Sequence, residues 1–238
     1  MVERLRDPAT RARVRADMLL PSTSWDNEWD EVKGPEGILV GVTLNPALRD
    51  LQGKTIAAIA KARGTDPLDT LLDILVEDGG GTQCAVFGMD EADVALALVQ
   101  PWTSINNDSS GTATEGLLGS EHPHPRAYGT FPRILRKYVR EEHKLSLEDA
   151  IRKFTALPAG RVRLADRGLI KQGLWADLVI FDPSEVADKA TFDAPNQLSV
   201  GMQWVLVNGV PVIAGGKMTG ARPGKVLRGA GYDKAMPR

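Results

Sequence analysis

The chain has 238 residues, of which 42% are hydrophobic and 25% charged, and its 29 basic side chains nearly balance 31 acidic ones. This balance argues against nucleic-acid binding driven by positive charge. The single cysteine excludes an internal disulfide and a Cys-rich zinc site. The N-terminal segment is too charged for a secretory signal, and no run of about 18 apolar residues could span a bilayer. We therefore expect a cytoplasmic protein with no membrane or nucleic-acid partner.

The first part of the chain alternates between helix and strand signals. Asp7-Pro8 and Asp66-Pro67 are each typical of a helix start, because the carboxylate caps the free N–H groups and proline has a helical φ. The predicted elements are, in order, a helix over 8–20, a strand over 36–43, helices over 54–62 and 67–79, a strand over 82–88, a helix over 91–99 and a strand over 102–106. This order predicts a parallel α/β sheet.

The second part of the chain is built differently. A polar loop over 107–129 precedes two predicted helices, over 132–143 and 146–157, and loops of this length are often functional. Beyond them the segments 175–182 and 203–216 are β-rich, and Asn208-Gly209 predicts a hairpin. We therefore predict two domains, residues 1–157 and residues 158–238.

Length limits the architecture of the first predicted domain. A closed (β/α)8 barrel needs about 200–250 residues. Only about 155 residues precede the β-rich tail, and they supply about three strands, so this chain cannot hold a whole barrel.

Asp108 lies just past the predicted strand 102–106, in the loop segment NNDSSG. Parallel strands deliver their last residues to the face on which α/β active sites are built, so this carboxylate is a candidate metal ligand or general base. The alternative is an aspartate that caps a turn. Met89 directly follows the predicted strand 82–88 and could line a pocket on the same face, or it could fill the core.

The segment HPHPRAYGTFPR, residues 122–133, carries the other candidates. His122 and His124 are spaced like a zinc-chelating pair, but prolines give them no regular projection, so a ligand-contacting or solvent-facing loop fits better. Arg126 and Arg133 lie near a helix start, where positive charge suits a carboxylate ligand. The alternative is that these arginines pair with nearby glutamates. Cys84 lies in an apolar strand and reads as a buried, inert thiol.

Taken together, these segments resemble one protein family. The C-terminal half of N-acyl-D-amino-acid deacylases (D-aminoacylases), a family of the amidohydrolase superfamily, is similar to four segments of this chain. They are HPRAYGTFPRILRKYVREE, ADLVIFDP, VNGVPV and TGARPG. The resemblance implies part of a TIM barrel, its last β/α units, followed by part of a small β-sandwich. It also implies zinc-dependent hydrolysis of the amide bond of N-acyl-D-amino acids.

The resemblance assigns roles to four residues. Asp108 aligns with the family's aspartate that takes a proton from zinc-activated water and passes it to the leaving amine, although both neighbours of Asp108 differ from the family's serine and glycine. Met89 aligns with a pocket methionine. His124 and Arg126 belong to the family's HPR run, where binding of the substrate carboxylate is implied.

The family's metal ligands have no counterpart in this sequence, because they lie upstream of the matching region. Zinc is therefore expected of a complete enzyme, with a second chain supplying the N-terminal half as one arrangement. Two alternatives stay open. The chain could be a noncatalytic fragment or interaction module, or it could belong to a cyclic-amide amidohydrolase.

Overall fold

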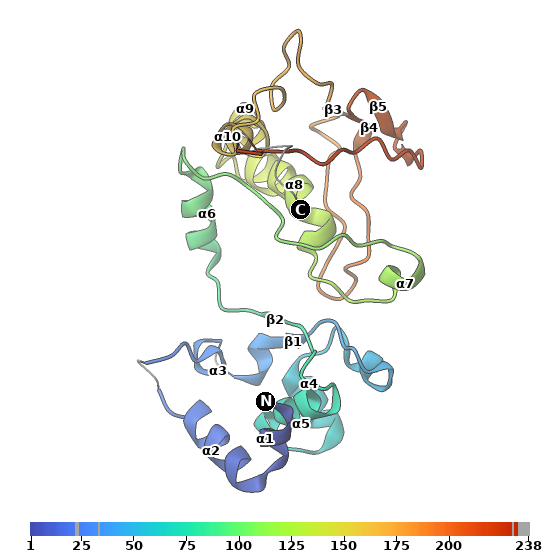
Figure 1. Cartoon of the computed structure of the whole chain (residues 1–238). Helices are drawn as coiled ribbons and strands as arrows, with labels where there is room; N and C mark the ends of the chain where they lie inside the picture. Colours follow the sequence, from blue (N-terminus) through green and yellow to red (C-terminus); the bar gives the residue numbers. More distant parts are fainter. Residues whose placement is uncertain (22–23, 33, 230, 233–238) are drawn as a thin grey trace. The chain divides into compact units, whose positions relative to one another are not determined.

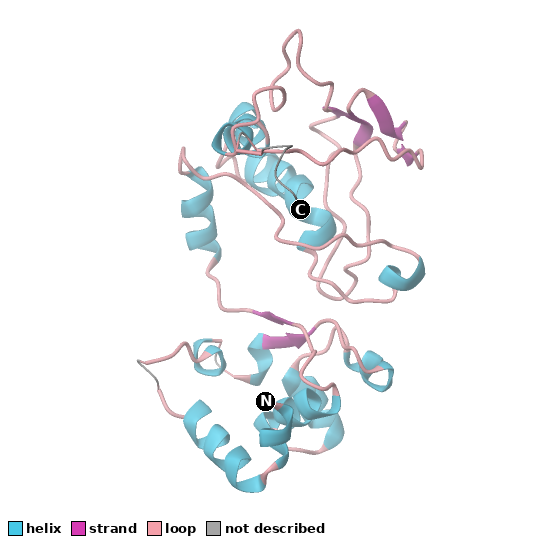
Figure 2. Ribbon diagram, viewed as in Figure 1, coloured by secondary structure: helices cyan, strands magenta, loops and turns pink. Residues whose placement is uncertain are grey.

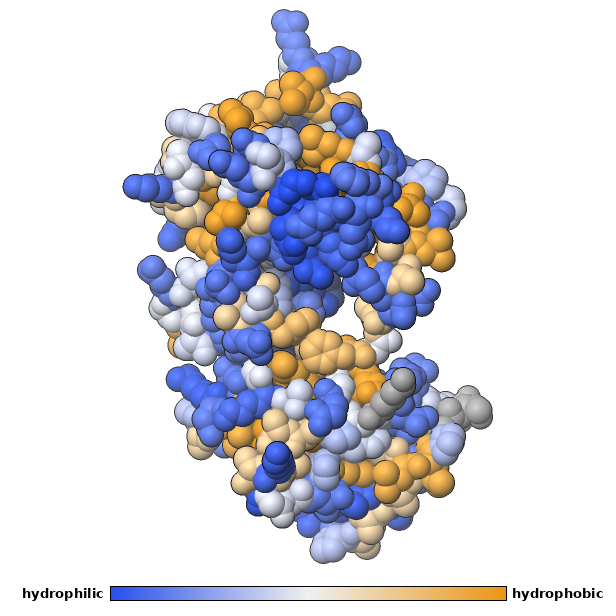
Figure 3. Space-filling model, turned by 180° about the vertical axis from the view of Figure 1, so that it is seen from behind, coloured by the Kyte–Doolittle hydropathy of each residue, from blue (hydrophilic) through white to orange (hydrophobic). Residues whose placement is uncertain are grey.

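The computed structural model describes residues 1–21, 24–32, 34–229 and 231–232. The chain divides into two compact units. Figure 1 colours the chain by position in the sequence, and Figure 2 colours it by secondary structure. The first unit holds Met1–Asp90, Gly111–Pro125 and Thr191–Asn196, and the second holds Glu91–Ser110, Arg126–Ala190 and Gln197–Arg238. Both units leave hydrophobic side chains exposed, and Figure 3 shows such residues in orange on one face. Across the described residues, every helix is too short or too polar to cross a bilayer.

The first unit is mostly helical. In chain order it contains α1 (Val2–Arg6), α2 (Pro8–Met18), α3 (Glu28–Glu31), η1 (Pro35–Gly37), β1 (Ile38–Val40), η2 (Pro46–Leu51), α4 (Ile56–Arg63), α5 (Pro67–Glu77), β2 (Cys84–Val86) and α7 (Gly116–Gly119). The predicted helix starts are confirmed: the Asp7 carboxylate accepts from the Thr10 N–H at 2.9 Å, and the Asp66 carboxylate accepts from two N–H groups of α5. Gly64, at φ 68°, closes α4 in the left-handed conformation that glycine adopts freely.

The two strands of this unit run antiparallel, with Ile38 opposite Val86 and Val40 opposite Cys84. The predicted parallel sheet is therefore wrong, and so is the predicted strand over 102–106, which is irregular. An alternation of strand and helix signals indicates which segments are extended but not their relative direction. Each strand here has only three residues, so the ladder contributes few hydrogen bonds of its own.

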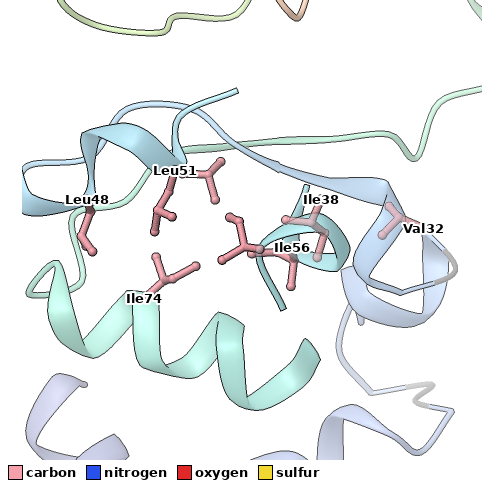
Figure 4. Packing of buried hydrophobic residues seen from close by; sticks show 8 residues of the cluster. Val32, Ile38, Leu48, Leu51, Ile56 and Ile74 are labelled. Carbon is pink, nitrogen blue, oxygen red and sulfur yellow. The ribbon is translucent and has the colours of Figure 1, made fainter. Parts of the chain in front are cut away.

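The buried residues of the main hydrophobic cluster of the first unit are aliphatic. They come from the turn after α3 and from β1, η2, α4 and α5: Val32, Ile38, Val40, Leu48, Leu51, Ile56, Ile59 and Ile74. Figure 4 draws the cluster as sticks and labels Val32, Ile38, Leu48, Leu51, Ile56 and Ile74. All three residues of β1 are buried, which explains why its sequence is apolar without alternation. By contrast, α2 buries none of its residues, as its many arginines predict.

The second unit combines five helical segments with one sheet. It contains α6 (Glu91–Val99), α8 (Arg126–Arg133), the π-helix η3 (Ile134–Glu141), α9 (Leu147–Phe154), α10 (Ala156–Arg161), β3 (Leu178–Phe181), β4 (Met202–Val207), β5 (Val210–Ala214) and β6 (Lys217–Met218). η3 continues directly from α8. Pro132, inside α8, has no N–H for the helical ladder, and the wider π turns begin two residues later.

The four strands of the second unit form an antiparallel sheet in sequence order. β4 and β5 make the predicted hairpin, in which Asn208 (φ 50°) and Gly209 (φ 82°) supply the two positive φ values of a tight turn. The predicted domain boundary near residue 157 lies within α10, inside this unit. The barrel and sandwich domains of a complete protein stay predictions.

Candidate active site

Asp108 lies in an irregular segment of the second unit and has a positive φ of 44°. Its N–H donates to the side-chain oxygen of Asn106 at 2.8 Å, so the asparagine forms the local turn that holds this backbone. Aspartate tolerates the left-handed conformation better than most residues. The carboxylate itself is 82% exposed. Asn106 is therefore the turn former, and Asp108 presents its carboxylate outward.

The structure brings two of the predicted site residues together. The Nη2 of Arg126, the first residue of α8, lies 2.8 Å from the Oδ2 of Asp108. Both side chains are exposed, Arg126 at 45% and Asp108 at 82%. The partner of Arg126 is therefore an aspartate 18 positions earlier, whereas the sequence suggested only glutamates as alternatives to a ligand.

Arg133 is bound differently from Arg126. Its guanidinium lies 3.5 Å from Asp188, whose other oxygen accepts from Arg136 Nε at 2.7 Å. The Asp188 carboxylate is only 7% exposed, so it is a buried anion neutralised by arginines. Sequence reasoning did not find Asp188, because nothing in its neighbourhood marks it. Arg133 thus has a structural partner and Arg126 has the candidate base.

The two histidines of the HPHP segment lie in the first unit and hold the Thr191–Asn196 segment. The Nε2 of His122 is 2.6 Å from the carbonyl oxygen of Phe192, and the ring of His124 packs edge-on against the Phe192 ring, with centroids 4.9 Å apart. The interpretation of His122 and His124 as a loop rather than a zinc pair agrees with this arrangement.

Two further residues lie in the first unit. Met89 is 82% exposed, so it is not core filler. Cys84 is also exposed, and the prediction of a buried thiol is wrong. Desolvation of its sulfur and the nearby Glu28 carboxylate both raise the pKa of the Cys84 thiol. At neutral pH it is therefore a protonated thiol rather than a nucleophilic thiolate.

The residues described in the structure do not fit a metal centre. Within these ranges, no three histidine, cysteine, aspartate or glutamate side chains gather closely enough to hold an ion.

Comparison with known proteins decides the family. The family model described as "Amidohydrolase family" matches residues 41–213, a range that includes Met89, Asp108 and Arg126. This chain belongs to the amidohydrolase family.

Relatives of this chain include a deacylase and a D-aminoacylase. The chain is 48% identical over 141 residues to N-acyl-D-aspartate deacylase of Alcaligenes xylosoxydans xylosoxydans, covering 59% of this chain and 27% of the relative. It is 40% identical over 178 residues to D-aminoacylase of the same bacterium, covering 75% and 34%. The chain thus spans about a third or less of the length of these relatives.

Solved structures point to the same group of amidohydrolases. N-acyl-D-glutamate deacylase from Bordetella bronchiseptica, complexed with zinc and a phosphonate inhibitor, matches with a TM-score of 0.65 and 34% identity over 77% of this chain and 36% of that one. A D-aminoacylase mutant in complex with copper chloride matches with a TM-score of 0.67 and 35% identity over 80% of this chain and 37% of that one. The α/β fold of this chain is similar to that of these D-aminoacylases.

Proposed function

We propose that this chain takes part in hydrolysis of the amide bond of N-acyl-D-amino acids, as part of a longer or complemented enzyme, with Asp108 as the catalytic acid–base residue. The observation that carries the proposal is the 2.8 Å contact between Asp108 and Arg126 within the amidohydrolase match. In this proposal Asp108 is the proton acceptor, and the guanidinium beside it suits a substrate carboxylate. The names of the relatives supply the substrate class.

Asp108 moves one proton in this proposal. Its carboxylate takes a proton from water as the water oxygen bonds to the amide carbonyl carbon. When the C–N bond breaks, Asp108 returns that proton to the departing nitrogen. The products are a carboxylate and a D-amino acid, and Asp108 is again an ionised carboxylate.

Arg126 binds the carboxylate of the amino-acid part of the substrate. Its ion pair with Asp108 is open to solvent, so a second carboxylate can compete for the guanidinium. His124 and Met89 are proposed as further substrate-contacting residues, in keeping with the family's HPR run and pocket methionine. Both side chains are exposed in the first unit.

Zinc belongs to the proposal only for the complete enzyme. A structure of the related N-acyl-D-glutamate deacylase is complexed with zinc. When bound there, zinc would supply a more acidic water. The described residues of this chain contribute the proton acceptor and the carboxylate-binding guanidinium.

A chimera tests the proposal. The segment of this chain that matches D-aminoacylase from Alcaligenes xylosoxydans xylosoxydans over 178 residues replaces the corresponding segment of that relative, and the product is loaded with zinc. We expect release of amino acid from N-acetyl-D-aspartate, N-acetyl-D-glutamate or N-acetyl-D-methionine and none from the L-enantiomers. Asp108→Asn should lower kcat by about 100-fold or more, because the amide oxygen is a far weaker base. Asp193→Asn, at an exposed position in another loop, is the matched control.

Three results would contradict the proposal. Full turnover by the Asp108→Asn chimera would remove Asp108 from the mechanism. Turnover of hydantoins or dihydropyrimidines in place of N-acyl-D-amino acids would indicate a cyclic-amide amidohydrolase. A folded, zinc-loaded chimera without any turnover would favour a noncatalytic role.

A further inference from the structure

The segment Gln100–Ile105, which precedes Asp108, is not part of a β-sheet. In the structure it is irregular, and its backbone carbonyls therefore need partners outside a β-ladder. Two backbone contacts order it locally: the Thr103 N–H donates to the Gln100 carbonyl at 3.1 Å, and the Ile105 N–H donates to the carbonyl of Lys153 at 3.2 Å. These two bonds alone leave most of its carbonyls unpaired.

Three basic side chains of α9 and α10, here called the basic clamp, supply those partners: Arg152, Lys153 and Arg161. The contacts from the clamp are Arg152 Nη2 to the Pro101 carbonyl at 2.9 Å, Lys153 Nζ to the carbonyls of Gln100 and, at 3.3 Å, Thr103, and Arg161 to the Trp102 carbonyl and, at 3.0 Å, Ser104 Oγ. Every residue from Gln100 to Ser104 is thus bound by a cation.

Lys153 is the central member of the clamp. Its side chain is fully buried, at 0% exposure, and its Nζ lies 3.8 Å from the Oδ2 of the Asp149 carboxylate. Desolvation lowers the pKa of Lys153 below its ordinary value. A buried ammonium is costly unless its N–H donors are satisfied, and two carbonyls of the Gln100–Ile105 segment accept from two of its three N–H groups. The burial of this charge therefore depends on the segment keeping its conformation.

We infer that the basic clamp positions Asp108, by fixing the backbone that ends three residues before it. Arg152, Lys153 and Arg161 are positioning residues: they act on carbonyls and touch no reacting atom. The clamp, the segment and Asp108 all lie in the second unit. This inference rests on the proposed function of Asp108 and adds the residues that hold it in place.

The first test uses the 238-residue chain and requires no catalysis. Amide hydrogen exchange of Thr103 and Ile105, followed by NMR, reports the conformation of the segment. Arg161→Met should speed exchange at both amides about tenfold, and Arg161→Lys, which keeps a cationic donor, should stay within about twofold of wild type. Lys144→Met, at an exposed position before α9, is the control. Lys153→Met should speed exchange at these amides more than Arg161→Met does. If Lys153→Met does not fold, the exchange rates of Arg161→Met, at an exposed position, still test the clamp.

The second test measures turnover by the chimera with the same substitutions. We expect kcat per folded molecule to fall about tenfold in Arg161→Met, with KM within about twofold, and to recover in Arg161→Lys, because small displacements of a catalytic group slow the reaction. Unchanged exchange at Thr103 and Ile105 would overturn the clamp. Faster exchange with unchanged kcat would overturn the positioning role. If the wild-type chimera hydrolyses no amide, the proposed function is wrong. The exchange rates of Thr103 and Ile105 in the 238-residue chain then still test the clamp.

Discussion

Replacing Asp188 by asparagine removes one buried negative charge from the second unit and keeps the shape of the side chain. The carboxylate is 7% exposed and accepts from Arg136 Nε at 2.7 Å, with Arg133 Nη1 3.5 Å away. A hydrogen bond to a charged group contributes about 1.5–3 kcal/mol. Arg133 is 47% exposed and adds little. We therefore expect Asp188→Asn to lower the free energy of unfolding of this unit by about 2 kcal/mol.

The effect of Asp188→Asn has a defined pH dependence. Burial alone would raise the pKa of Asp188, but the hydrogen bond and charge of Arg136 lower it below its ordinary value of 3.8. A carboxylate whose pKa is lower in the folded state stabilises the fold above its unfolded pKa and loses that contribution as pH falls through the folded pKa. The difference between wild type and Asp188→Asn should therefore be full at about pH 6 and shrink below pH 3.8.

Urea unfolding followed by amide NMR signals of the second unit measures this difference. Glu148→Gln, which removes an exposed carboxylate from α9, is the control and should change stability by less than about 0.5 kcal/mol. A change in stability for Asp188→Asn no larger than that of this control would contradict a stabilising contact between Asp188 and Arg136. So would a difference in stability between wild type and Asp188→Asn that widens as pH falls.

Two further predictions concern local packing and charge. An added Cβ at Gly129 in α8 would lie 3.1 Å from the Cβ of Asp188, whereas at Gly160 in α10 it would meet nothing within 4 Å. Gly160→Ala should therefore raise the free energy of unfolding, measured by calorimetry, by roughly 0.5–1 kcal/mol, whereas Gly129→Ala should not raise it. An equal increase for both variants would contradict the close contact between Gly129 and Asp188. Raising NaCl from about 0.05 M to 1 M should speed amide exchange in α2 about fivefold, because α2 buries no residue and is held by ion pairs of Arg11 and Arg15 to α5 and its cap. Amide exchange rates in α2 that do not change with NaCl concentration would show that these ion pairs do not stabilise the helix.

The features predicted correctly from sequence are those whose causes are adjacent in the chain. Asp7 and Asp66 each accept from an N–H two or three residues later, so a tripeptide or tetrapeptide contains the whole signal. Asn208-Gly209 likewise carries its positive φ values in two residues. These local signals therefore do not depend on contacts with distant segments.

The features that sequence reasoning missed depend on contacts between distant segments. The direction of β2 relative to β1 depends on how α4 and α5 return the chain, and the residues of the strands do not encode it. Lys153 had one usable signal: it lies three positions after buried Ala150 and directly before Phe154, on the apolar face of α9. A lysine on that face predicts a buried cation, although its partners, 50 positions or more away, stay hidden.

The exposed ion pair between Arg126 and Asp108 leads to a last prediction about the substrate. A solvent-exposed pair contributes about 1 kcal/mol or less, so a carboxylate on the substrate can take over Arg126 at small cost, and this frees Asp108 to accept a proton. Replacing the α-carboxylate of N-acetyl-D-glutamate by its amide should then raise KM of the chimera about tenfold or more, since charged hydrogen bonds contribute about 1.5–3 kcal/mol. Arg126→Met should abolish this discrimination between acid and amide. Arg133→Met, whose guanidinium faces Asp188 instead, should preserve it. If Arg133→Met erased the preference and Arg126→Met kept it, the carboxylate would bind at Arg133 and the assignment of Arg126 would be wrong.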